Sequence, residues 1–138
     1  MGLDVGTKAI GVALTDEANI AAHPLTVLAR SGNSGDARAI ATLVAQHVVT
    51  DVVIGMPFEL SGRVGHRARR VQALVTVLRE ALGETVTCHE QDERFTTAQA
   101  ERVLIEADVS RRKRREVIDQ QAATLILQAW LDAHRASK

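Results

Sequence analysis

The first sixteen residues constrain the fold more than any other stretch, because they predict a β-hairpin with an acid inside it. Leu3 to Val5 is a short apolar run, Gly6 to Lys8 suits a tight turn, and Ile10 to Leu14 is a second apolar run. Asp4 lies within the first run, and burying a carboxylate costs free energy unless something positive faces it. In many enzymes that partner is a metal ion, whereas in a structural protein it is an arginine or a helix end.

Two classes of enzyme begin with a hairpin of this kind. Actin-like and hexokinase-like ATPases carry Asp-x-Gly-Thr there and meet phosphate with backbone amides and the threonine. Ribonuclease H-like nucleases use the aspartate to hold a metal. Actin-like ATPases bind nucleotide between two domains, whereas a chain of 138 residues is expected to form one domain, residues 1–138. Length therefore favours the nuclease.

Composition limits how the chain can bind its partners. With 17 basic and 17 acidic residues the formal net charge is zero, so nucleic-acid binding requires local patches. Two Phe, one Trp and no Tyr leave few rings on which bases can stack. Cys88 is the single cysteine, which suits a reducing compartment. Because no apolar run approaches the roughly 20 residues of a membrane span and no signal peptide heads the chain, we expect a cytoplasmic protein that does not bind membranes.

Apolar periodicity beyond the hairpin predicts the order βββαβαβαα. Pro24 restricts its strand to a sheet edge or a strand end, and Ser34 or Asp36 is the expected cap of the first helix. Three meandering strands followed by strand–helix units indicate an α/β fold, a mixed five-stranded sheet with helices on both faces. The strands expected after the hairpin are residues 22–29, 51–55 and 85–89, and the helices expected are residues 37–48, 64–82, 96–107 and 116–133.

Acids that are distant in the sequence lie on elements that can converge. Asp4 is in the first strand, the pair Asp92-Glu93 follows the last strand, and Asp119 is near the start of the last helix. Each has a structural alternative: Asp119 can favour the positive end of its helix, and Glu93 can pair with Arg94 or cap the next helix. Together, oxygen ligands from separate elements are what an Mg²⁺ or Mn²⁺ site needs, and a pair of such ions promotes phosphodiester cleavage. The sequence alone does not decide between Asp92 and Glu93 as ligand.

Basic residues form a second constellation. One group crowds the start of the second helix, and the run from Arg111 to Arg115 immediately precedes Asp119. Such runs are often only solvated faces, but beside a metal site in a chain of zero net charge they suggest a phosphate backbone as partner. The expected nucleic-acid contacts are Lys8, Arg67, Arg70, Arg94, Arg111, Arg112, Lys113, Arg114 and Arg115.

Collinear motifs over nearly the whole chain resemble the YqgF/RuvX family of Holliday-junction-resolvase-like nucleases, which is implicated in processing the 5′ end of pre-16S ribosomal RNA. The resemblance implies the ribonuclease H-like fold and metal-dependent cleavage, with Asp4, Glu93 and Asp119 as catalytic residues and metal ligands. The loop after the 51–55 strand departs from the family pattern at Glu59 and Ser61-Gly62, which bears on specificity if that loop holds substrate. The motifs are Gly2-Leu-Asp-Val-Gly-Thr-Lys8, Val53-Ile-Gly-Met-Pro57, Asp92-Glu-Arg-Phe-Thr-Thr97, Glu106-Ala-Asp-Val-Ser-Arg111 and Val117-Ile-Asp119.

The function expected from these observations is a cytoplasmic, Mg²⁺- or Mn²⁺-dependent endonuclease that acts on structured nucleic acid and processes the 5′ end of pre-16S ribosomal RNA. The alternatives are a Holliday junction DNA resolvase and a weakly catalytic nucleic-acid-binding module of the same fold. The presence of all three acids favours an enzyme. The expected partner is a ribosomal RNA precursor or branched DNA, and the chain is either a monomer or a homodimer, since a resolvase that cuts two strands symmetrically needs a dimer.

Overall fold

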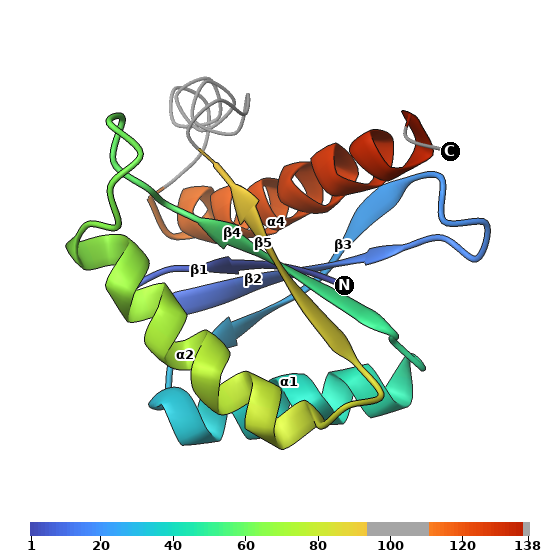
Figure 1. Ribbon diagram of the computed structural model, residues 1–138, viewed down its shortest axis with the longest axis horizontal. Coiled ribbons are helices and arrows are strands. Elements are labelled where there is room, and N and C mark those ends of the chain that lie inside the picture. The colour runs from blue at the N-terminus through green and yellow to red at the C-terminus, as the bar shows by residue number, and fades with distance from the viewer. Residues whose placement is uncertain (94–110, 137–138) are drawn as a thin grey trace.

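The computed structural model describes residues 1–93 and 111–136, with side chains described in residues 1–93 and 121–134 (Figure 1). Its five strands form one sheet in the order β3-β2-β1-β4-β5. The central strand β1 pairs antiparallel with β2 and parallel with β4. At the two edges, β3 pairs antiparallel with β2, and β5 pairs parallel with β4. The expected mixed five-stranded sheet is therefore confirmed. The elements are β1 (Gly2–Val5), β2 (Ala9–Thr15), β3 (Ala22–Ala29), α1 (Asn33–Gln46), β4 (Asp51–Met56), α2 (His66–Leu82), β5 (Thr87–Asp92) and α4 (Arg111–Ala136).

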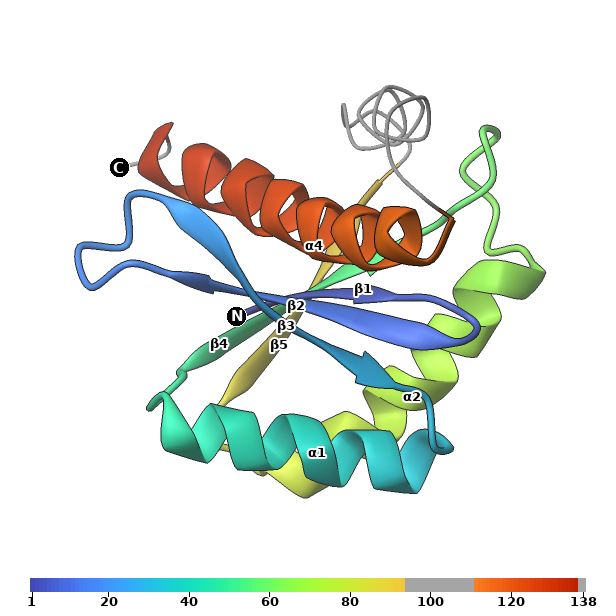
Figure 2. The ribbon, with the colours of Figure 1, turned by 180° about the vertical axis from the view of Figure 1, so that it is seen from behind.

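Different helices cover the two faces of the sheet, as expected: α1 and α2 lie on one face and α4 crosses the other (Figure 2). Because strand side chains alternate between faces, each central strand contributes to both layers. The layer under α1 and α2 is built from large side chains that include Leu3, Ile10, Val12, Val52, Ile54 and Met56. The layer under α4 contains Ala13, Val53, Ala123, Ile126, Leu127 and Leu131.

Helix α4 lies very close to the backbone of β1. A Cβ atom placed on Gly2 would be 2.7 Å from the Cβ of Leu127 and 2.8 Å from the carbonyl oxygen of Ala123, so only glycine fits there. Leu3, the next residue, packs in the core of the opposite face. Alternation then directs Asp4 to the same face as Gly2, the one that α4 covers.

One buried ion pair ties the β1–β2 turn to the start of α1. The Nε of Arg30 lies 2.6 Å from Oδ2 of Asp36, which is 1% exposed. The two other guanidinium nitrogens of Arg30 donate to the carbonyl of Gly6 (2.8 Å) and to Oδ1 of Asn33 (3.0 Å). Burial alone would raise the pKa of Asp36, but hydrogen bonds from the Ser31 N–H and from Arg30 outweigh it and lower that pKa.

Several expectations about individual elements are corrected. Helix α1 begins at Asn33 rather than residue 37. The apolar pattern did not reveal this earlier start, because the first turn is polar. The N-cap is Gly32, not Ser34 or Asp36. Strand β5 runs on through the polar residues 90–92, which pair with the buried end of β4. Helix α4 begins at Arg111 rather than about residue 116, since arginine and lysine are good helix formers.

The expectation for Pro24 is confirmed, because it lies on an edge strand, β3. The expectation for Val64 is wrong: this residue is 41% exposed and precedes α2 instead of joining its apolar stripe. The helix expected over residues 96–107 lies outside the described residues. None of the described helices combines the length and apolar character that crossing a membrane requires.

Candidate functional site

Asp4 and Glu93 both belong to the face of the sheet that α4 covers. Asp4 is 8% exposed and sits near the carboxyl end of β1. Glu93 comes directly after β5, and its backbone N–H donates to the carbonyl of Met56 at 3.1 Å, which carries the pairing one step past the strand.

Gly55 shows where the carboxylate of Glu93 lies. A Cβ atom on Gly55 would be 2.7 Å from Oε1 of Glu93 and 2.5 Å from Cδ1 of Ile126 in α4. The carboxylate therefore rests on the backbone of β4 beneath α4, and its Oε1 atom is buried. The sequence carries one signal for this contact, a glycine inside an apolar strand, which often marks the close approach of another group; the expected site residues did not include Gly55.

The pairing of β1 with β4 brings the two acids together. Gly2 is opposite Val53 and Leu3 is opposite Ile54, so the same parallel register sets Asp4 beside Gly55. Neighbouring strands lie roughly 4.8 Å apart. Asp4 and the carboxylate over Gly55 thus occupy adjacent positions at the carboxyl ends of two adjacent parallel strands.

The register also separates the two members of the Asp92-Glu93 pair. Asp92 is opposite Met56, whose side chain is fully buried in the layer under α1 and α2. Partners in a parallel ladder point to the same face, so Asp92 is directed away from α4. Of the two acids, Glu93 is the one that shares the face of Asp4.

The third expected acid, Asp119, lies in α4, whose sheet-facing residues include Ala122, Ala123 and Ile126. Asp119 precedes these by three, four and seven residues, so its helical position continues the stripe that faces the sheet. Its side chain lies outside the described residues. Within the described part of the chain, no three His, Cys, Asp or Glu side chains converge as a metal site would need, so the three-acid site stays a prediction.

The expected nucleic-acid contacts fall into two groups. Lys8, Arg67 and Arg70 are exposed, on the β1–β2 turn and on α2. Arg67 and Arg70 line a hollow of about 420 Å³ together with Thr7 of that turn. The Arg111 to Arg115 run forms the beginning of α4; the side chains of this run, and Arg94 altogether, lie outside the described residues.

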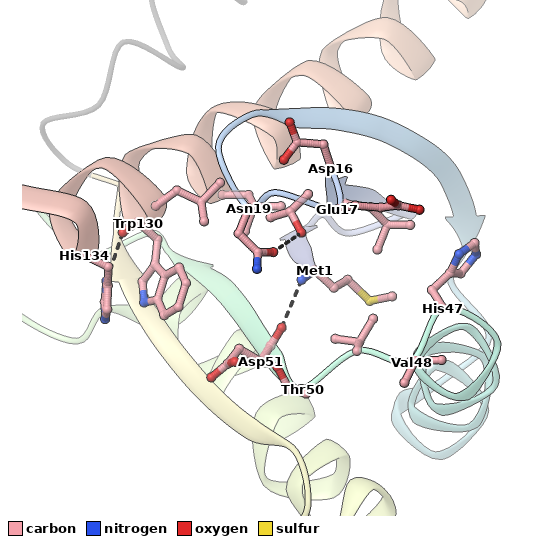
Figure 3. A pocket seen from close by; sticks show the side chains of 15 residues that line it. Met1, Asp16, Glu17, Asn19, His47, Val48, Thr50, Asp51, Trp130 and His134 are labelled. Atoms are coloured by element: carbon pink, nitrogen blue, oxygen red, sulfur yellow. Dashed lines mark hydrogen bonds between the residues drawn. The ribbon is translucent and has the colours of Figure 1, made fainter.

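A second hollow, of about 730 Å³, lies at the opposite end of the sheet, where β1 and β4 begin (Figure 3). Trp130 and His134 of α4 stack on one wall with ring centres 3.9 Å apart. Nε2 of His89 lies 2.9 Å from Oδ1 of Asp51, another lining residue. Asp4, Glu93, Lys8, Arg67 and Arg70, the expected site residues whose side chains are described, do not line this hollow.

Comparison with known proteins shows the family of this chain and its fold. Residues 1–133 match the family model described as RuvX, Holliday junction resolvase. A protein of Myxococcus xanthus named "Putative pre-16S rRNA nuclease" is 49% identical over 135 residues, which cover 98% of this chain and 88% of that protein. A protein of the same name from Desulforudis audaxviator is 44% identical over 138 residues, covering 100% of this chain and 96% of its own.

Solved structures with the same fold include proteins in complex with a Holliday junction substrate. RuvC of Thermus thermophilus in complex with a Holliday junction substrate superposes with a TM-score of 0.63 at 15% identity, covering 99% of this chain and 94% of RuvC. The fowlpox virus resolvase, also bound to Holliday junction DNA, gives a TM-score of 0.55 at 10% identity, covering 96% of each chain. These similarities confirm the expected ribonuclease H-like fold.

Proposed function

Because this chain belongs to the RuvX family of Holliday junction resolvases, we propose that it is a divalent-metal-dependent endonuclease that cleaves phosphodiester bonds in structured nucleic acid. We further propose that its substrate is the precursor of 16S ribosomal RNA, a substrate that the name of its relatives gives for them, and that it processes the 5′ end of that precursor. The observation that carries the proposal is the placement of Asp4 and the Glu93 carboxylate on adjacent positions of one sheet face, beneath α4.

The residues present suit a divalent metal. Asp4 is nearly buried and Oε1 of Glu93 is buried, and two ionised carboxylates at adjacent positions repel each other unless a cation offsets their charge. Carboxylate oxygens are the ligands that Mg²⁺ and Mn²⁺ prefer. In this proposal Asp4, Glu93 and Asp119 hold the metal. Bound there, it would activate water for attack on phosphorus and stabilise the leaving oxygen.

The cations of the chain would position the substrate around these acids. Lys8, Arg67 and Arg70 are exposed close to the carboxyl ends of β1 and β4. Arg94 and the Arg111 to Arg115 run flank Glu93 and Asp119 in sequence. Contacts from these residues to phosphate would orient the strand without reading its sequence.

Replacing Asp4 by asparagine tests the proposal, because the side chain keeps its shape and loses the charge that would hold the cation. The protein is incubated with a 16S ribosomal RNA precursor and with a four-way DNA junction, each with Mg²⁺, Mn²⁺ or EDTA. We expect the unmodified protein to cleave the RNA only with metal, and Asp4→Asn to cleave it slower by orders of magnitude. Binding of Asp4→Asn to RNA in EDTA should hold or tighten, because a carboxylate near phosphate repels it.

Asp92→Asn is the matched control, since Asp92 is directed to the opposite face and should leave cleavage near the unmodified rate. Thermal unfolding in EDTA separates a ligand from a structural acid. Asp4→Asn should unfold at the same or a higher temperature if Asp4 is a ligand, but should lose several kcal/mol if it anchors the fold through a buried cation. A well-folded Asp4→Asn protein that cleaves at the unmodified rate would end the proposal, and preferential cleavage of the junction would replace RNA with DNA as substrate.

A further inference from the structure

The hollow beside the β1–β2 turn, which we call the arginine pocket, is bounded by Thr7, Arg30, Gly32, Asn33, Arg67 and Arg70. We propose that the arginine pocket binds a backbone phosphate of the nucleic-acid substrate, distinct from the phosphate that is cleaved. This inference rests on the proposed function for the identity of its ligand.

The lining of the arginine pocket is strongly basic. Three arginines line it and, among the residues that the structure describes, no Asp or Glu does, although the chain as a whole has equal numbers of basic and acidic residues. Arg30 is already held by Asp36, Gly6 and Asn33. Arg67 and Arg70 are exposed, and in the described part of the chain their side chains make no ion pair or hydrogen bond. These two cations are therefore available to an anion.

Neutral polar groups that suit a phosphate oxygen also line the pocket, beside apolar residues such as Val5 and Pro57. Thr7 is exposed on the turn and carries a hydroxyl group. Gly32 and Asn33 belong to the N-terminus of α1, a helix of 14 residues whose N-cap makes no side-chain hydrogen bond among the described residues. Backbone N–H groups at a helix N-terminus favour anions. Because Asp36 already lies in this first turn, the attraction for an anion rests mainly on Arg67 and Arg70.

The arginine pocket and the acids lie on opposite faces at the same end of the sheet. Val5, which packs with the core under α1 and α2, lines the pocket and directly follows Asp4. Pro57, another lining residue, follows Gly55 by two. Figure 2 shows the β1–β2 turn between the N-terminal end of α4 and the helices of the other face. A strand that crosses this rim can place one phosphate beside the acids and another in the pocket.

The larger hollow at the other end of the sheet makes a useful contrast. Asp16, Glu17 and Asp51 all line it (Figure 3), and carboxylates repel phosphate. Of the two hollows, only the arginine pocket has the charge that a nucleic-acid backbone requires.

The test measures binding of a fluorescent four-way DNA junction and a 16S precursor fragment in EDTA, which removes cleavage from the result. The variants are Arg67→Gln, Arg70→Gln and the double variant. Arg69→Gln is the matched control, because Arg69 is exposed on the same helix and does not line the pocket. We expect the double variant to bind at least one of these two ligands roughly tenfold more weakly, with its salt slope reduced by about one, and Arg69→Gln to change little.

A scan of single methylphosphonates along one strand of the ligand that binds identifies the phosphate. Neutralising the phosphate in the pocket should weaken binding by the unmodified protein and have no effect on the double variant. Equal losses for Arg69→Gln and the pocket variants, or no methylphosphonate position with this pattern, would overturn the proposal. So would inorganic phosphate that displaces the nucleic acid at equal affinity, which would mark a free-phosphate site. This binding test does not depend on cleavage. A protein that cleaves neither substrate in the assay above, but passes the binding test, would therefore refute the proposed nuclease activity and leave the phosphate site of the arginine pocket supported.

Discussion

Gly55 offers the sharpest test of whether the position of the Glu93 carboxylate matters. In Gly55→Ala the new Cβ would lie 2.5 Å from Cδ1 of Ile126, 2.7 Å from Oε1 of Glu93 and 2.8 Å from its Cδ. Ile126 is fully buried in the layer under α4 and has little room to retreat. The carboxylate lies at the end of a longer side chain, so it is the group expected to move.

The size of the effect follows from these contacts. Overpacking a filled core by one methyl group typically costs about 1–3 kcal/mol, and with both neighbours under 3 Å we expect about 2 kcal/mol lost from the free energy of unfolding. A real Cβ contact needs more than 3 Å, so the carboxylate must shift by several tenths of an ångström to about 1 Å. A misplacement of that size at a reacting centre can reduce the rate about 100-fold.

Gly2→Ala is the control, since its new Cβ would clash with residues of the same helix, α4, and not with Glu93. Its Cβ would meet the Cβ of Leu127 at 2.7 Å and the Ala123 carbonyl oxygen at 2.8 Å, atoms that no side-chain rotation can remove. We expect it to destabilise the protein at least as much as Gly55→Ala.

Urea unfolding gives the stability of each variant, and cleavage is then measured at a temperature where both are folded. Gly55→Ala should cleave about 100-fold more slowly than the unmodified protein, and Gly2→Ala by far less. Equal rates for the two variants would show that Gly55 serves packing alone, and that the site does not depend on where Glu93 lies.

Two further predictions concern Asp36 and the basic run. Asp36→Asn should lower the free energy of unfolding by about 3 kcal/mol in urea at neutral pH, because it breaks a buried pair with Arg30. The pKa of Asp36 is lowered in the folded protein, so the free energy that its ionised carboxylate adds to folding is present above its ordinary pKa and is lost as the pH falls through the lowered value. Asp36→Asn should therefore reduce the fall in the free energy of unfolding with decreasing pH on the acid side. An unchanged pH dependence in the variant would refute this. Replacing Arg111 to Arg115 with alanine should weaken nucleic-acid binding and flatten its salt dependence, while circular dichroism shows the helix retained because alanine is a good helix former. An unchanged salt slope would mean that the run is only a solvated face.

The sheet could be predicted from the sequence because its signals are local. The apolar runs on either side of Gly6 to Lys8 form the hairpin in the structure, and Pro24 lies on an edge strand, where the missing N–H does not break a central ladder. Within the run 51–55, the apolar residues 52–55 are buried on both faces, as a central apolar strand should be. Each of these features depends on the period of a few neighbouring residues.

The choice between Asp92 and Glu93 could not be made from the sequence. Adjacent residues of a strand point to opposite faces, and a shift of one residue in register exchanges them. That register is set by the pairing of β5 with β4, where Asp92 is opposite Met56. The ion pair of Arg30 with Asp36 escaped prediction for a related reason, since it depends on how the loop folds back and on no periodic pattern.

The two faces of the sheet differ in side-chain size, and this difference positions the acids. The face under α1 and α2 is filled by leucine, isoleucine, valine and methionine. On the face under α4, Gly2 and Gly55 let Leu127 and Ile126 approach the strand backbone itself. A helix so close to the sheet brings its own residues to the level of Asp4, and the glycine in β4 leaves space for the Glu93 carboxylate beside it. The same close approach explains why glycines stand in two buried strands where a larger apolar residue would otherwise add stability.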